Sequence, residues 1–229
     1  MSTEPKVVIT GTGRAGTTLL VQILTDLGLD TGFDADHRLD DRIRAGLEFR
    51  IESPGAPRII KDPNLSRRLG DLLDRGVVDI GHVIVPIRDL DVATASRVRN
   101  TRYGADLHTF GGLFGTARAT RQRDALAGLF YELFWTIARY ELAHTLLEFP
   151  RFATDWEYTY RRLSFLDPAI PAHRWREVIE ARTDAALIHE TPLTRGERAK
   201  TILGTAYNRG IARPLRAARR LMAGDDPRS

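Results

Sequence analysis

The stretch from Val7 to Leu20, VVITGTGRAGTTLL, consists of a short apolar run, a glycine-rich turn and the start of a second apolar run. Backbone N–H groups in such a turn, placed just before the N-terminus of a helix, can bind a phosphate or a similar anion. The turn fits three nucleotide-binding patterns that differ in their ligand. The sequence therefore predicts an anion site whose ligand must be inferred from other residues.

The first pattern is the dinucleotide motif G-x-G-x-x-G, which Gly11, Gly13 and Gly16 satisfy. This motif also requires a second strand that ends in an acidic residue about twenty positions later, to bind a ribose. The segment GLDTGFDAD supplies acids but has little strand character; these acids are Asp30, Asp34 and Asp36. A nicotinamide or flavin enzyme is therefore the least favoured of the three interpretations.

The second pattern is the P-loop, G-x-x-x-x-G-K-[ST], in which Gly11 and Gly16 form the outer frame and Thr18 is the hydroxyl residue. Thr17 occupies the lysine position. Without that lysine, a nucleoside triphosphate with its metal ion is poorly neutralised. A kinase or nucleoside triphosphatase remains an alternative.

The third interpretation keeps the N–H cradle and places a smaller, less charged anion in it, with added donors from Arg14 and the hydroxyls of Thr17 and Thr18. The run GRAGTTLL resembles the first motif of the sulfotransferase family, in which a basic residue and a small residue precede Gly-Thr-Thr. The resemblance implies that the turn binds the 5′-phosphosulfate of the donor 3′-phosphoadenosine 5′-phosphosulfate. The residues implied in this binding are Gly11, Thr12, Gly13, Arg14, Ala15, Gly16, Thr17 and Thr18.

A second similarity to this family lies in Arg88, which closes the apolar run HVIVPIR, and Ser96, which follows eight positions later. In the family, such an arginine and serine hold the 3′-phosphate of the donor. A guanidinium at the end of a strand can bind a phosphate through two hydrogen bonds, while a hydroxyl on the next helix donates beside it. The alternative is that Arg88 pairs with Asp62 or Asp89.

Lys61 stands at the end of the run RIIK and is followed by Asp-Pro, as in many members of the family. An ammonium group there would stabilise the charge that develops on the leaving oxygen during sulfuryl transfer. The alternative is a salt bridge to Asp62. Because only three of the 34 basic residues are lysines, the retention of this lysine favours the functional interpretation.

The acceptor must lose a proton as it attacks, so a general base should lie beside it. Some branches of the family use a glutamate after the first helix. Here the segment GFDADHR offers Asp34 and Asp36, and next His37, which agree in position but not in residue type; the alternative is that the two acids only cap the helix that follows. An aromatic ring should stack on the adenine, and we expect this of Trp156, with a core position as the alternative.

Strands and helices alternate along the chain, which predicts a three-layer α/β fold with a central parallel sheet and helices on both faces, like that of the P-loop nucleoside triphosphatases. Expected strands are 6–10, 58–63, 82–89 and 151–154, and expected helices are 16–27, 64–76, 90–102 and 121–148. Ligands of parallel sheets bind at the carboxyl ends of the strands. This arrangement would bring the turn, Lys61 and Arg88 together.

The 229 residues, 42% of them hydrophobic, predict a single domain, 1–229, with a basic helical segment from about residue 194. The chain has no cysteine, and no apolar run approaches the roughly 18 residues of a membrane span, so we expect a cytoplasmic protein without a membrane partner. The net charge of +4 comes from dispersed arginines, which does not favour nucleic-acid binding.

We therefore expect a sulfotransferase that acts on a hydroxyl or amine of a small acceptor and needs no metal ion. A nucleotide-dependent kinase and a non-catalytic nucleotide-binding protein are the alternatives. The acceptor pocket should involve segments 34–52 and 103–120, where His108 is a possible contact. A basic loop could close over the 3′-phosphate, with Arg195, Gly196, Arg198 and Lys200; the alternative is a solvated terminal helix. The sequence leaves the acceptor and the oligomeric state open.

Overall fold

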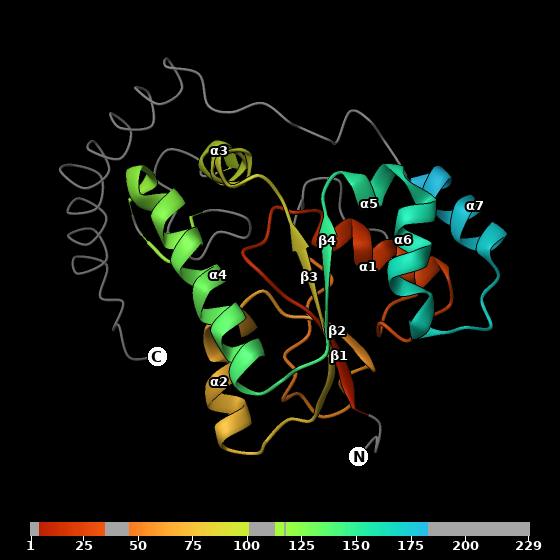
Figure 1. Cartoon of the computed structure of the whole chain (residues 1–229), viewed down its shortest axis with the longest axis horizontal. Helices are drawn as coiled ribbons and strands as arrows, with labels where there is room; N and C mark the ends of the chain where they lie inside the picture. Colours follow the sequence, from red (N-terminus) through yellow and green to blue (C-terminus); the bar gives the residue numbers. More distant parts are fainter. Residues whose placement is uncertain (1–4, 35–45, 101–112, 117, 183–229) are drawn as a thin grey trace, which may run out of the picture.

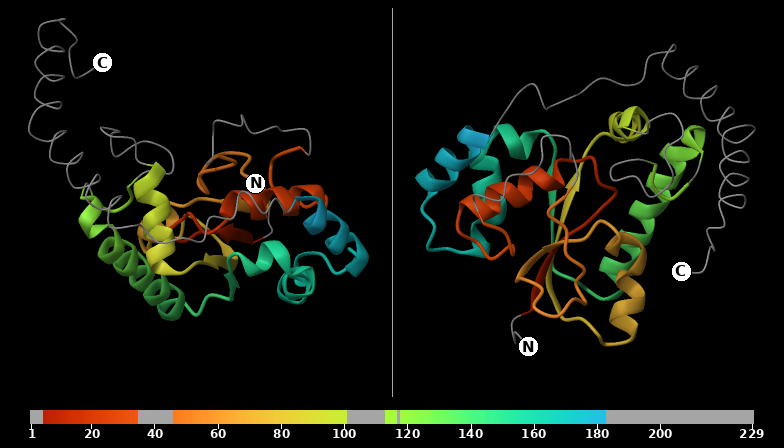
Figure 2. Two further views of the ribbon diagram at one scale, coloured as in Figure 1. Left: turned by 90° about the horizontal axis from the view of Figure 1, so that it is seen from above. Right: turned by 180° about the vertical axis from the view of Figure 1, so that it is seen from behind.

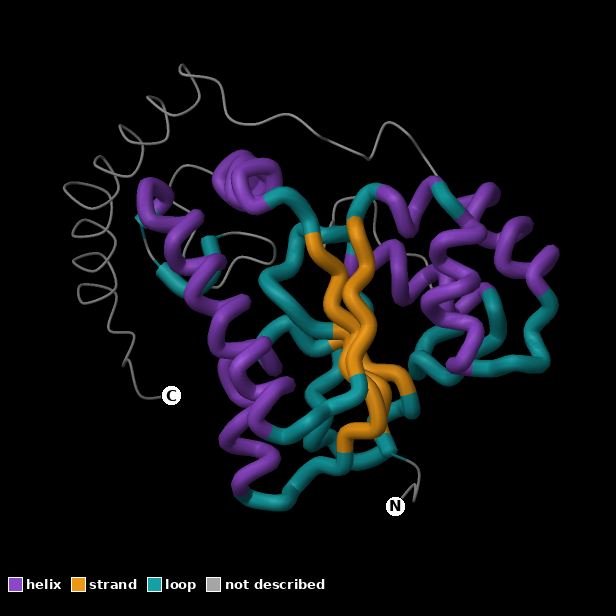
Figure 3. The backbone as a smooth tube through the Cα atoms, viewed as in Figure 1, coloured by secondary structure: helices purple, strands orange, loops and turns teal. Residues whose placement is uncertain are grey.

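A computed structural model of the chain describes residues 5–34, 46–100, 113–116 and 118–182. Its centre is a four-stranded sheet in the order β2-β1-β3-β4, in which every neighbouring pair is parallel (Figure 3). The strands are β1 (Lys6–Ile9), β2 (Ile59–Lys61), β3 (Ile80–Ile87) and β4 (His144–Glu148). The first three lie within the segments that the sequence predicts as strands or overlap them closely.

Helices flank the sheet (Figures 1 and 2). The helices are α1 (Thr17–Asp26), α2 (Leu65–Asp74), α3 (Leu90–Asn100), α4 (Gln122–Arg139), α5 (Arg151–Thr154), α6 (Trp156–Leu163) and α7 (Ala172–Arg182), with short 3₁₀ turns at Ala119–Arg121 and Ser164–Leu166. Helix α1 lies with α5, α6 and α7 on one side, whereas α2 and α4 lie on the other and α3 packs on α4. The predicted α/β fold with a parallel sheet is confirmed.

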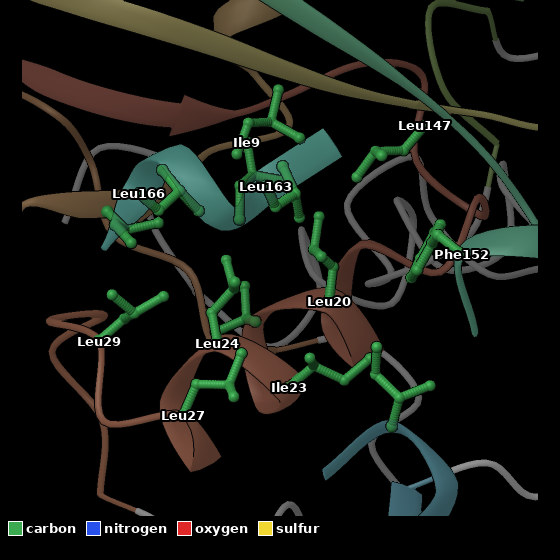
Figure 4. Packing of buried hydrophobic residues seen from close by; sticks show 14 of the residues in the cluster. Ile9, Leu20, Ile23, Leu24, Leu27, Leu29, Leu147, Phe152, Leu163 and Leu166 are labelled. Atoms are coloured by element: carbon green, nitrogen blue, oxygen red, sulfur yellow. The ribbon is translucent and has the colours of Figure 1, made fainter. Parts of the chain in front are cut away.

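The two faces of the sheet build separate hydrophobic clusters because neighbouring side chains on a strand point in opposite directions. Val7 and Ile9 of β1 belong to the cluster with α1 and α5 to α7, while Val8 between them packs with α2 and α4. Figure 4 shows the first cluster, in which leucine and isoleucine side chains of α1 meet residues of β1, β4 and α6. This packing fixes α1, and with it the turn that precedes α1, against the sheet.

Two predictions about the second half of the chain are wrong. The helix expected over 121–148 ends at Arg139, and the last residues of that segment form β4. Glu141 adopts a left-handed conformation with φ of 51°, which ends the helical path, and the next residues pair with β3. Segment 151–154, expected as the fourth strand, is helix α5.

Both errors have one physical cause. The run HTLLE has apolar residues that fit a helix or a strand equally well, and only the free edge of β3 selects the strand. Pro150 then cannot continue a strand ladder, and the chain turns into α5. None of the helices in the described part of the chain combines the length and the hydropathy of a helix that crosses a membrane.

Candidate functional site

The glycine-rich turn leaves the carboxyl end of β1 and leads into the N-terminus of α1 (Figure 1). Gly13 and Gly16 have φ of 68° and 72°, and Arg14 between them has φ of 62°, so three residues adopt left-handed conformations. For a residue with a side chain this conformation costs about 1–2 kcal/mol. Arg14 therefore carries backbone strain, which is common at binding sites.

Gly16 lies so close to neighbouring rings that no side chain fits there. A Cβ atom on Gly16 would lie 2.5 Å from the ring of Phe149 and 2.9 Å from that of Phe152. Gly16 is also the N-cap residue of α1 and has no side chain to cap the first N–H groups of the helix. The end of β4 thus packs directly against an anion-compatible helix N-terminus.

Lys61, at the end of β2, reaches across to the start of α1. Its Nζ atom donates hydrogen bonds to the hydroxyl of Thr18, at 2.9 Å, and to the carbonyl of Gly46, and lies 3.3 Å from a carboxylate oxygen of Glu48. Its side chain is 2% exposed, and this burial lowers the pKa of the ammonium, an effect that the charge of Glu48 opposes. The acidic partner of Lys61 is therefore Glu48, whereas Asp62 lies 3.8 Å from Arg68.

Arg88, at the start of the turn after β3, contacts the glycine-rich turn as the sequence predicts. Its guanidinium donates to the carbonyl of Arg14 at 3.3 Å and lies 4.9 Å from the centre of the Phe149 ring. The Nε atom of Arg14 donates to the hydroxyl of Ser96 at 3.1 Å. Arg88 and Ser96 are both buried, and they meet the turn through Arg14.

Comparison with known proteins leaves the family of the chain open. No protein-family model, curated protein or solved structure matches it. Within the described residues, no group of three or more histidine, aspartate or glutamate side chains is placed to hold a metal ion. The chemistry of the site therefore depends on what its own residues can bind and stabilise.

The other predicted site residues are more scattered. Asp34 is exposed and, among the described residues, makes no interaction with the turn or with Lys61. Trp156 begins α6 and is partly buried against the hydrophobic cluster around α1, a position that agrees with its alternative role in the core. Outside the described residues lie Asp36, His37 and His108 and the C-terminal set Arg195, Gly196, Arg198 and Lys200.

Two site residues were missed in the sequence. Arg97 directly follows Ser96, is 5% exposed and donates to the carbonyl of Thr12 through Nε at 3.1 Å and through a second guanidinium nitrogen. Glu48 lies in the segment expected to line the acceptor pocket, yet nothing in its local pattern separates it from neighbouring acids. A buried arginine has a weak sequence signal as well, because the chain uses arginine almost everywhere.

Proposed function

We propose that this chain is a sulfotransferase with a P-loop-like fold. It would transfer the sulfuryl group of 3′-phosphoadenosine 5′-phosphosulfate to a hydroxyl or amine of a small acceptor. The order of elements supports the proposal, because the turn joins a central parallel strand to a helix and the other basic residues lie at the ends of adjacent strands. The interaction between Lys61 and Thr18 carries most of the argument.

In a P-loop that binds a triphosphate, the hydroxyl at the position of Thr18 ligates Mg²⁺. Here this hydroxyl accepts a hydrogen bond from the ammonium group of Lys61, which is buried. The ammonium group of Lys61 also supplies positive charge beside the turn, which has Thr17 in place of the usual P-loop lysine. A site in which a fixed ammonium occupies the place of the metal ion favours a phosphosulfate over a triphosphate with Mg²⁺.

The cluster of Arg14, Arg88 and Ser96 supports a donor with two anionic ends. One guanidinium of the cluster comes from the turn itself, and the other comes from the end of β3. Together with the N–H groups of the turn, they offer charge-assisted hydrogen bonds for a 5′-phosphosulfate and a 3′-phosphate. ATP lacks the second of these groups.

In the proposed reaction, the acceptor oxygen or nitrogen attacks sulfur, and the bond between sulfur and the bridging phosphate oxygen breaks. The electron pair of that bond moves to the bridging oxygen, where Lys61 stabilises the charge, and adenosine 3′,5′-bisphosphate leaves. A carboxylate takes the acceptor proton. Glu48 is well placed for this role, since its partly exposed carboxylate lies 3.3 Å from Lys61 Nζ; Asp34 and Asp36 are the other candidates.

The donor can be tested by thermal denaturation. Adenosine 3′,5′-bisphosphate without magnesium should raise the melting temperature, because a ligand that binds only the folded state stabilises it. ATP with magnesium should raise it far less. A shift with ATP and magnesium, and none with the bisphosphate, would replace this proposal with a kinase.

Arg88→Ala tests the 3′-phosphate site. The variant should bind the bisphosphate about 10–100 times more weakly, because one charge-assisted interaction with the 3′-phosphate is lost, while its affinity for adenosine 5′-phosphate should fall far less. Comparing two ligands on the same variant removes any effect on folding. Arg151→Ala is a matched control, since Arg151 also stacks on an aromatic ring, that of Tyr158 at 4.4 Å, but is exposed. Equal losses of affinity for the bisphosphate and for adenosine 5′-phosphate would mean that Arg88 has a purely structural role.

A further inference from the structure

Arg97 joins the anion-binding turn to a second segment of the protein. Its guanidinium bonds the carbonyl of Thr12 on one side and lies 5.0 Å from the centre of the Phe114 ring on the other. A Cβ atom on Gly13 would lie 2.5 Å from this guanidinium, so turn and side chain are in direct contact. Arg97 therefore lies between the turn and residue 114.

Phe114 is itself held in place by α4. The side chain of Gln122, which is fully buried at the start of α4, donates to the Phe114 carbonyl and accepts from the Phe114 N–H, both at 2.7 Å. This pair of bonds fixes the backbone of residue 114 as a strand neighbour would. The exposed side chain of Arg67 contacts the same ring at 5.7 Å. A chain of contacts thus runs from α4 through Phe114 and Arg97 to the turn.

The burial of Arg97 is costly. Loss of solvent, together with the nearby charge of Arg14, lowers the pKa of Arg97 to about 10, which still leaves it positively charged at neutral pH. Buried charges persist in proteins when they are well hydrogen-bonded or serve a function. The hydrogen bonds that Arg97 donates to the turn fix one peptide group there.

The consequence for the turn follows from peptide geometry. In a trans peptide the C=O and N–H groups point in opposite directions, so a Thr12 carbonyl directed at Arg97 turns the Gly13 N–H away from Arg97. Arg88 acts in the same way on the peptide group between Arg14 and Ala15, because it binds the Arg14 carbonyl and thereby orients the Ala15 N–H. Two N–H donors of the turn are thus oriented before any ligand arrives.

We propose that Arg97 is a positioning residue of the anion site, which fixes the Gly13 N–H toward the anion and is itself held by Phe114 and Gln122. The identity of the anion rests on the proposed function, but the orientation of the turn does not. Residues 113–116 lie within segment 103–120, which is expected to line the acceptor pocket. Changes at Phe114 should therefore alter anion affinity, although Phe114 itself does not contact the turn's carbonyl.

The test compares Arg97→Lys, Arg97→Met and Phe114→Leu with the control Arg67→Lys, because the exposed side chain of Arg67 contacts the same ring. Hydrogen–deuterium exchange of peptides that cover residues 10–20 reports the order of the turn without any ligand. Titration calorimetry with adenosine 3′,5′-bisphosphate then reports affinity. The melting temperature of each variant identifies a general loss of stability.

We expect hydrogen–deuterium exchange in residues 10–20 to be slowest in the wild type, faster in Arg97→Lys and fastest in Arg97→Met. Exchange should also increase in Phe114→Leu but not in Arg67→Lys. Bisphosphate affinity should fall about tenfold in Arg97→Lys, as expected for one lost charge-assisted hydrogen bond, and further in Arg97→Met. This order is the signature of positioning, because lysine can restore one bond to the Thr12 carbonyl and methionine cannot.

Unchanged hydrogen–deuterium exchange in residues 10–20 of both Arg97 variants would overturn the proposal. A uniform increase in exchange over the whole chain, with a matching fall in melting temperature, would also overturn it. If Arg97→Met does not fold, Phe114→Leu decides by the same readouts. If the wild-type protein does not bind the bisphosphate, but exchange in 10–20 increases in Arg97→Lys, the proposed sulfotransferase function is refuted and the positioning role of Arg97 is retained. If the wild-type protein binds the bisphosphate, but exchange in 10–20 does not change in the Arg97 variants, the positioning role is refuted and the proposed function is retained.

Discussion

The contact between the glycine-rich turn and the end of β4 predicts different outcomes for two similar substitutions. Gly16 and Gly28 lie at the two ends of α1 and have similar left-handed conformations, with φ of 72° and 83°. A Cβ atom on Gly16 would lie 2.5 Å from the Phe149 ring, whereas a Cβ atom on Gly28 would meet nothing within 4 Å. Gly16→Ala and Gly28→Ala therefore share the backbone strain and differ only in crowding.

The magnitudes follow from these two terms. The left-handed conformation costs alanine about 1–2 kcal/mol, partly offset by about 0.4–1 kcal/mol because alanine restricts the unfolded chain more than glycine does. Gly28→Ala should therefore lose about 1 kcal/mol. Gly16→Ala must in addition displace rings that are at most 8% exposed, which costs about 1–3 kcal/mol more.

Urea unfolding of both variants measures the difference in free energy directly. At about 2–4 °C per kcal/mol for a chain of this size, the melting temperature of Gly16→Ala should lie about 2–12 °C below that of Gly28→Ala. Bisphosphate binding should be lost in Gly16→Ala and retained in Gly28→Ala. Equal losses of stability would refute the reasoning, since they would mean that the Phe149 ring yields without cost.

Three further predictions concern charged groups. Burial lowers the pKa of Lys61 in the folded chain below 10.5, so between the folded and unfolded pKa values the unfolded chain binds more protons than the folded one. In urea titrations over this pH range, the stability of the wild type should therefore rise with pH relative to that of Lys61→Met. Asp155 caps α6, because its carboxylate accepts a hydrogen bond from the N–H of Tyr158 at 2.9 Å, and this bond lowers the pKa of Asp155. Asp155→Ala should therefore lower the urea midpoint at neutral pH. The difference from the wild type should vanish in acid, where the carboxyl group is protonated. Arg182 binds both carboxylate oxygens of Asp26, so Arg182→Met should cost up to about 1 kcal/mol, less in molar salt; a loss independent of salt would contradict an ionic origin.

Local patterns predicted much of the fold. The first three strands and the first three helices lie close to their expected positions. The clearest signals are those of α1 and α2, which combine an apolar helical period with a glycine or proline near each boundary. The fourth strand was misplaced, since HTLLE carries no such signal and its conformation depends on the edge of β3. The same reasoning placed Lys61 and Arg88 near the turn, because the carboxyl ends of parallel strands converge.

The sequence by itself determined the glycine-rich turn and which of its residues are candidates for binding an anion, because a glycine pattern and a helix start are local features. Only the tertiary structure decided which partners these residues have. Arg97 meets the Thr12 carbonyl across 85 residues of sequence, and Lys61 pairs with Glu48 rather than with its neighbour Asp62. Such choices depend on how strands and helices pack, and on which buried charge finds a partner, and no local pattern records either.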